Sequence, residues 1–155
     1  MVNQAEERLQ AAGVELPPAV APFGAYVPAV QTGRLLFLSG MLPTVGHEPT
    51  FLGRLGRELT TEQGREAAAD AARNALAVAR RHLGSLDRIS QVVRLGVSIA
   101  TAGDFLEHAK VADGASELLR DIFGADKLAA RLVLGVASLP FGVPIELELI
   151  FEVAE

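Results

Sequence analysis

The sequence of 155 residues has no cysteine, no tryptophan and only one tyrosine. The absence of cysteine excludes disulfides, thiolate nucleophiles and cysteine-based metal sites. The three histidines, His47, His82 and His108, are far apart in the chain and stand in unlike surroundings, which disfavours a zinc site built from them. We therefore expect no resident metal ion.

The chain also lacks a surplus of positive charge and lacks long apolar runs. Its net charge is −5, from 14 Lys and Arg against 19 Asp and Glu, and the arginines are scattered, which disfavours a nucleic-acid partner. No apolar run approaches the roughly 18 residues that a membrane helix needs. The first residues have neither the basic nor the apolar region of a signal peptide. We expect a cytoplasmic protein with no membrane partner.

Half of the residues are apolar and 21% are charged, which is typical of a globular domain. The length is sufficient for one domain with a sizeable core. We interpret residues 1–155 as a single domain. Within it, residues 1–20 form an N-terminal extension, with a helix over 3–12 followed by a proline-rich connector.

The first half of the domain predicts a hairpin and a long helix. Apolar residues on both sides of Thr32-Gly33 predict two strands around that turn, and a Gly- and Pro-rich loop follows with a short strand near 51–55. The alanine-rich stretch 61–83 has helical spacing of its apolar residues. Thr60 with Gln63 resembles a capping box at its start, and Gly84 supplies its end.

The second half predicts one more helix and three strands. A strand occupies the second half of 86–101, a helix with an irregular start around 110–114 lies within 103–124, and strands follow over 130–138 and 145–153. This order predicts an α+β fold with helices packed on one face of a mixed sheet.

The strand that begins at Arg131 is apolar or small on both faces over residues 131–137. Strands of this kind are covered on both sides, and helices are available for only one side. We therefore expect a second subunit to cover the other face. If the last two strands pair as a hairpin, Arg131 lies far from their turn and Glu146 lies near it, so a joint site would need residues from two chains.

Two charged residues on these strands have two interpretations each. Arg131 either forms an ion pair with a Glu or Asp at the strand end, or presents its guanidinium fork to a carboxylate or phosphate. Glu146 either belongs to a solvated strand face or takes part with Arg131 in a joint site. Near the first hairpin, Ser39-Gly40 is either a simple strand end or an exposed hydroxyl and N–H, and Tyr26 is either a cleft wall or a strand residue.

Two stretches of the sequence resemble a known family. AYVPAVQTGRLLFLSGMLP looks like the N-terminal signature, and ARLVLGVASLPFGVPIELE the C-terminal signature, of the RidA (YjgF-like) reactive-intermediate deaminases, also described as the endoribonuclease L-PSP family. The resemblance covers residues 20–153. It implies a chorismate-mutase-like homotrimer with clefts between subunits, and the N-terminal extension is typical of a less characterised branch.

The resemblance also implies roles for particular residues. Arg131 matches the arginine that binds the substrate carboxylate, and Glu146 matches the glutamate that positions or activates water. Tyr26, Ser39 and Gly40 match substrate-binding residues of the family's cleft.

Two further positions depart from the family pattern. Asp113 falls near a substrate-binding position that is usually asparagine, and Val133 falls where many members carry cysteine.

The activity that these matches imply is hydrolysis of a 2-imino or enamine acid to a 2-keto acid and ammonia. The substrate is then a small carboxylate-bearing molecule, and no cofactor is needed, because an imine carbon is already electrophilic. Two alternatives remain open. The same cleft could bind a keto acid or another carboxylate without turnover, or the chain could cleave RNA, which its acidic charge disfavours.

Overall fold

The computed structural model describes residues 4–155, so the first residue of the helix expected over 3–12 lies outside the described part. The helices are α1 (Ala5–Ala11), α2 (Thr61–Leu83) and α3 (His108–Phe123). The strands are β1 (Ala29–Thr32), β2 (Leu35–Leu38), β3 (Thr44–Val45), β4 (Glu48–Pro49), β5 (Ile89–Ala100), β6 (Ala130–Val136) and β7 (Ile145–Val153). A short 3₁₀ turn, η3 (Pro140–Gly142), lies between the last two strands.

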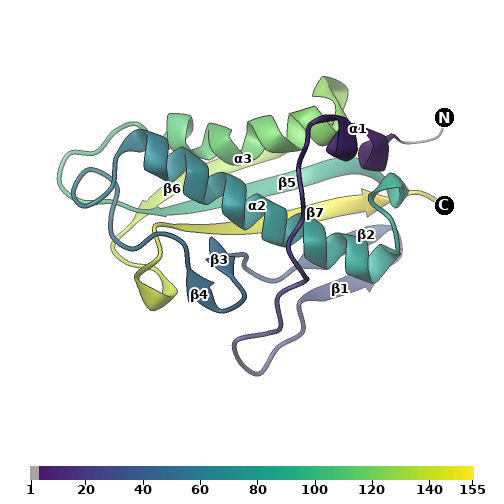
Figure 1. The fold of residues 1–155 in the computed structure, drawn as a ribbon, viewed down its shortest axis with the longest axis horizontal. Helices are drawn as coiled ribbons and strands as arrows, with labels where there is room; N and C mark the ends of the chain where they lie inside the picture. The colour runs from purple at the N-terminus through teal and green to yellow at the C-terminus, as the bar shows by residue number, and fades with distance from the viewer. Residues whose placement is uncertain (1–3) are drawn as a thin grey trace.

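The five longer strands form one sheet in the order β1-β2-β7-β5-β6. Strands β5 and β6 are parallel and the other neighbours are antiparallel, so the sheet is mixed. Helices α2 and α3 lie side by side along one face of this sheet (Figure 1). The α+β fold with helices on one face is therefore confirmed. None of the helices formed by residues 4–155 is long and apolar enough to cross a membrane.

The pairing of the last two strands differs from the expected hairpin. Strand β5 lies between β6 and β7, because α3 connects β5 to β6 as a parallel crossover and places β6 at the sheet edge. Two local expectations were also wrong. The short strand lies at β3 and β4 rather than near 51–55, where Gly53 has a φ of +115°. Residues 110–114 belong to a continuous helix.

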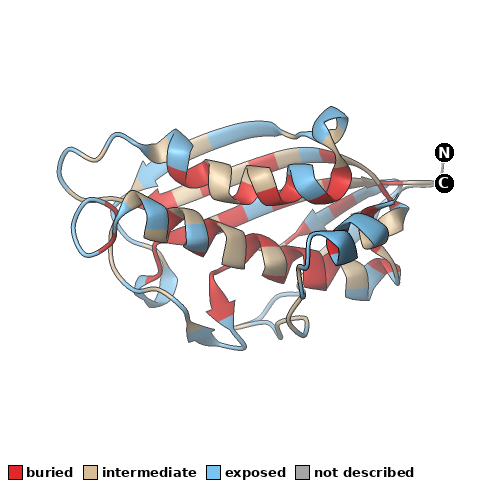
Figure 2. Ribbon diagram, turned by 45° about the horizontal axis from the view of Figure 1, so that its top comes forward, coloured by how far each residue is buried: buried red, intermediate tan, exposed pale blue. Residues whose placement is uncertain are grey.

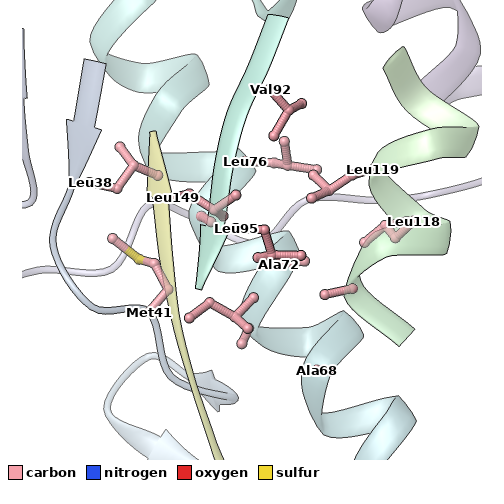
Figure 3. Packing of buried hydrophobic residues seen from close by; sticks show 14 of the residues in the cluster. Leu38, Met41, Ala68, Ala72, Leu76, Val92, Leu95, Leu118, Leu119 and Leu149 are labelled. Carbon is pink, nitrogen blue, oxygen red and sulfur yellow. The ribbon is translucent and has the colours of Figure 1, made fainter. Parts of the chain in front are cut away.

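Helix α2 covers the middle of the sheet, and its ends follow from local sequence. The Thr60 hydroxyl accepts from the N–H of Gln63 at 3.2 Å, and the Gln63 side chain accepts from the N–H of Thr60 at 2.9 Å. Gly84 ends the helix in a left-handed conformation with φ +84°. The buried face of α2 is mostly alanine, and Figure 3 shows Ala72 and Leu76 within the core formed with β5, β7 and α3.

The opposite face of the sheet is open in the single chain. Buried residues concentrate between the helices and the sheet (Figure 2), whereas Phe37, Leu132 and Leu134 are 38%, 48% and 50% exposed. Their cross-strand partners place all three on the face turned away from the helices. None of the described residues of the same chain covers this face of β6, which the sequence predicts to be buried.

The N-terminal extension is tied to the helical layer by one glutamate. Glu6 of α1 forms an ion pair with Arg80 of α2 at 2.8 Å, and its carboxylate accepts from the N–H of Leu86 at 2.8 Å. Leu9 of the same helix is 3% exposed and belongs to the core cluster. The extension is therefore part of the packed domain.

The close approach of α2 and α3 depends on Gly114. A Cβ atom at this position would fall on the backbone carbonyl of Arg65 in α2. We expect Gly114→Ala to destabilise the protein by about 1–3 kcal/mol through overpacking. In an exposed helix interior the same change stabilises by about 0.5–1 kcal/mol. The sign of the shift in the urea midpoint tests this, and a stabilised variant would contradict so close an approach.

Candidate functional site

A cleft of about 460 Å³ opens where three separate segments meet at the end of the sheet. They are the loop before β1, the end of β2, and the segment that runs from η3 into β7. Its lining comprises Phe23, Gly24, Tyr26, Ser39, Gly40, Leu42, Pro140, Phe141 and Glu146. The fold thus brings together four of the residues that the sequence singled out: Tyr26, Ser39, Gly40 and Glu146.

Backbone pairing places Glu146 against Gly40. Met41 and Leu147 exchange two backbone hydrogen bonds of 2.9 Å in an antiparallel bridge, so Gly40 and Glu146 lie diagonally across the two segments on the same, outer face of the sheet. A Cβ atom at Gly40 would lie 2.5 Å from Oε2 of Glu146. Any side chain at position 40 would therefore require the Glu146 carboxyl group to move.

The carboxyl group of Glu146 is partly buried and has no ion-pair partner among residues 4–155. Desolvation raises the pKa of its carboxyl group above the ordinary value, because burial penalises the charged form. The carboxyl group makes no hydrogen bond or ion pair with any of residues 4–155. Its neighbour along the same strand face, Glu148, instead forms an ion pair with Arg94 at 3.2 Å. Glu146 is therefore the carboxyl group of β7 that is suited to accept and release a proton.

The hydrogen bonds of Ser39 fix what its hydroxyl group can do. Its Oγ donates to the carbonyl of Val27 at 2.6 Å, and its backbone N–H donates to the carbonyl of Pro28 at 2.9 Å. Because the hydroxyl hydrogen is used, Ser39 faces a ligand as an acceptor. Tyr26, 44% exposed, accepts from the N–H of Phe23 at its phenol oxygen and forms a wall of the cleft.

The structure does not bring Arg131, Asp113 and Val133 into this cleft within one chain. Arg131 is paired with Leu95 across the sheet and points to the helical side, whereas Glu146, paired with Ser98, points to the other side. Nη1 of Arg131 binds Oδ1 of Asp113 on α3 at 2.7 Å.

Arg131 therefore forms an ion pair with an acidic residue, which is one of its two predicted roles. Ser116 adds a second contact to Nη1, its Oγ lying at 3.1 Å. Val133 packs against the core on the same side as Arg131. One chain therefore holds two separate groups of candidate residues, one on each face of the sheet.

Asn74 is a positioning residue that sequence reasoning missed. It is 1% exposed, and its Nδ2 donates to the carbonyls of Leu42 and Thr44 at 2.8 and 2.9 Å. These bonds hold the segment that follows Gly40 against α2. A polar residue within the alanine-rich buried face of a predicted helix is the signal that could have identified it. No group of three or more Asp, Glu or His side chains among residues 4–155 is arranged to hold a metal ion.

The raised pKa of Glu146 predicts a pH-dependent gain from Glu146→Gln. A carboxyl pKa that is higher in the folded state favours folding at low pH, and this contribution is lost as pH rises through the folded pKa. We expect Glu146→Gln to raise the unfolding temperature at pH 7. The gain should shrink towards pH 4, where wild type carries the neutral form.

Glu148→Gln is the matched control, since it lies on the same strand face but removes an exposed ion pair. It should give no gain at pH 7. Equal gains from Glu146→Gln at pH 7 and pH 4 would show that burial of charge is not the cause.

Comparison with known proteins identifies relatives over nearly the whole chain. Residues 6–155 match the family model described as "YjgF/chorismate mutase-like, putative endoribonuclease". The chain is also similar to Protein TCP17 of Trypanosoma cruzi, with 39% identity over 145 residues that cover 93% of this chain and 91% of the relative.

Solved structures show the same fold. A protein of unknown function from Agrobacterium tumefaciens has a TM-score of 0.88 and 35% identity, covering 96% of this chain and 92% of that one. A "putative endoribonuclease" from Shewanella oneidensis has a TM-score of 0.92 and 34% identity, covering 97% and 100%. RidA from the Antarctic bacterium Psychrobacter has a TM-score of 0.64 and 25% identity, covering 90% and 97%. The chain therefore belongs to the YjgF family, the RidA and endoribonuclease L-PSP family that its two signatures resemble.

Proposed function

We propose that this protein hydrolyses 2-imino or enamine acids to 2-keto acids and ammonia, in a cleft that is completed by a second copy of the chain. The observation that carries the proposal is the half-buried, unpaired carboxyl group of Glu146, which lies against Gly40 beside an acceptor hydroxyl. Such a group takes a proton more readily than an exposed carboxylate, because its pKa is raised.

Glu146 accounts for the proton movements of the reaction. Its carboxylate accepts a proton from water while the water oxygen bonds to the carbon of the protonated imine and the C=N π electrons move to nitrogen. The same carboxyl group then returns the proton to nitrogen, which becomes a –NH3+ group. The C–N bond of the tetrahedral intermediate breaks, ammonia leaves, and the hydroxyl proton passes to the Glu146 carboxylate to give the keto acid. The step consumes one water and needs no oxidant.

Ser39 and Gly40 suit the two other polar parts of the substrate. The Ser39 oxygen faces the cleft as an acceptor, which matches the N–H of a protonated imine or of the leaving ammonia. The N–H of Gly40 has no acceptor among residues 4–155 and is available to an oxygen of the substrate. Together they orient the imine carbon towards Glu146.

Arg131 supplies the carboxylate clamp from a neighbouring copy in this proposal. Its guanidinium group uses Nη1 for Asp113 and Ser116, which leaves Nε and Nη2 for a carboxylate. Asp113 then orients Arg131 and does not contact the substrate itself. The uncovered apolar residues Phe37, Leu132 and Leu134 lie on the face through which copies would associate. We propose a homotrimer, as the signatures imply.

Cleavage of RNA receives less support from the cleft. No lysine or arginine is among its described lining residues, and the chain carries a net charge of −5. Phosphate contacts from basic side chains supply most of the affinity of RNA-binding surfaces.

An activity assay tests the proposed reaction directly. We expect purified protein to accelerate release of 2-ketobutyrate from the imine that a threonine dehydratase forms. Arg131→Ala should lower kcat/KM by about a hundredfold through lost positioning. Arg120→Ala, which removes an exposed arginine paired with Asp121 on α3, is the control and should leave the rate unchanged. If 2-ketobutyrate stabilises wild type against heat but no imine is hydrolysed, the protein is a binder and the proposed reaction is wrong.

Mixed assemblies test whether two chains build one site. Arg131→Ala and Glu146→Gln should each lose most of the activity when expressed alone. When the two variants are coexpressed, an interface that receives Arg131 from one variant and Glu146 from the other is intact. In random assemblies about one quarter of the sites should therefore be restored. Absence of any restored activity in mixed assemblies, verified by two affinity tags, would place both residues of a site in the same chain.

A further inference from the structure

The turn that leads into β7 contains a residue in an unfavourable backbone conformation. Phe141 has φ 60° and ψ 12°, and it is the one non-glycine residue with positive φ among residues 4–155. Gly142 follows with φ 74°, and the N–H of Val143 donates to the carbonyl of Pro140 at 3.2 Å. These angles define a type I′ turn, whose first central position favours asparagine, aspartate or glycine. Phenylalanine is thus present against local preference.

Burial in the core does not explain this choice of residue. Phe141 is 59% exposed, so its ring gains little from packing within its own chain. The turn is held in place by other contacts: the N–H of Gly53 donates to the carbonyl of Gly142 at 3.0 Å, and Val143 is fully buried. A strained residue with an exposed aromatic ring, on a firmly anchored turn, points to a role at the surface it faces.

That surface is the apolar end of the cleft. The ring of Phe141 lies 5.1 Å from the ring of Phe23, tilted by 38°. Phe23 in turn stacks on His47 at 4.1 Å, and Nε2 of His47 lies 2.9 Å from the carbonyl of Ala21. The two phenylalanines therefore form a braced aromatic wall. Glu146, Ser39 and Gly40 line the same cleft and supply its polar groups.

We propose that Phe141 and Phe23 form a side-chain subsite that selects 2-imino acids with aromatic or large branched apolar side chains over small ones. The inference rests on the proposed function, since Glu146 and Ser39 place the reacting carbon. An apolar substituent that extends from that carbon meets the aromatic wall, where it loses contact with water. The methyl side chain of a small 2-imino acid is too short to bury a comparable apolar area against this wall.

Phe141→Asn is the decisive variant because asparagine accepts the left-handed conformation. It should fold, with an unfolding temperature equal to or above that of wild type. Imines are made from L-phenylalanine and L-alanine by an amino-acid oxidase, and the keto acids formed are measured. We expect wild type to prefer the phenylalanine-derived imine, and Phe141→Asn to lower the ratio of the two kcat/KM values roughly tenfold.

Two further variants distinguish the effect of the Phe141 side chain from the effect of its backbone conformation and from a general loss of exposed apolar surface. Phe141→Leu keeps the strained turn and an apolar side chain, so it should retain part of the preference with no gain in unfolding temperature. Leu106→Asn removes an 84% exposed apolar side chain outside the cleft and should change neither ratio nor rate. Equal losses for both imines in Phe141→Asn, or a wild-type preference for the alanine-derived imine, would overturn the subsite.

Binding of the keto acids keeps the inference testable if no imine is hydrolysed. Phenylpyruvate should then raise the unfolding temperature more than pyruvate at equal concentration, and Phe141→Asn should abolish the difference. That outcome would reject the proposed reaction and support the subsite. Equal shifts for both acids in wild type would reject the subsite, whatever the activity.

Discussion

The close contact between the alanine face of α2 and the middle strand β7 is the constraint on which the rest of the structure depends. It buries alternate residues of β7, among them Leu147, Leu149 and Phe151, and so fixes which face of the strand is the core face. Period-two alternation then sends Glu146 and Glu148 to the other side. The reactive carboxyl group of the proposed mechanism is thus placed by helix packing on the opposite face of the sheet. Its access to a cleft follows from the position of β7 next to the end of β2.

Much of this arrangement could be predicted from sequence, because it is set by local rules. The limits of α2, its capping box at Thr60 and the turn at Gly33 each depend on a few neighbouring residues. The pairing of β6 with β5 could not be predicted in this way, because it depends on where the crossover helix α3 returns the chain to the sheet. For the same reason sequence could not show that Arg131 and Glu146 face opposite sides of one sheet. Asn74 was missed because its role depends on a segment that lies 30 to 32 residues away in the sequence.

Gly40 and Glu146 show how the cleft sets the behaviour of one carboxyl group. The absence of a side chain at Gly40 lets the carboxyl group pack against backbone, where water is partly excluded. A nearby cation would stabilise the charged form and lower its pKa, as an arginine does beside an exposed glutamate. Here none of residues 4–155 supplies one, and Arg131 is occupied by Asp113 on the far face.

Glu146 and Phe141 both lower the stability of the single chain, and both lie in the same cleft. A phenylalanine in left-handed conformation costs about 1–2 kcal/mol, and a desolvated carboxylate is unfavourable at neutral pH. Elsewhere the sequence follows local preference, with glycine at Gly33, Gly84 and Gly124, where φ is positive. Residues that depart from local preference without a packing gain are expected at functional sites. Two such departures, one chemical and one conformational, converge on one cleft, which supports the proposal that its polar and aromatic residues belong to a single substrate site.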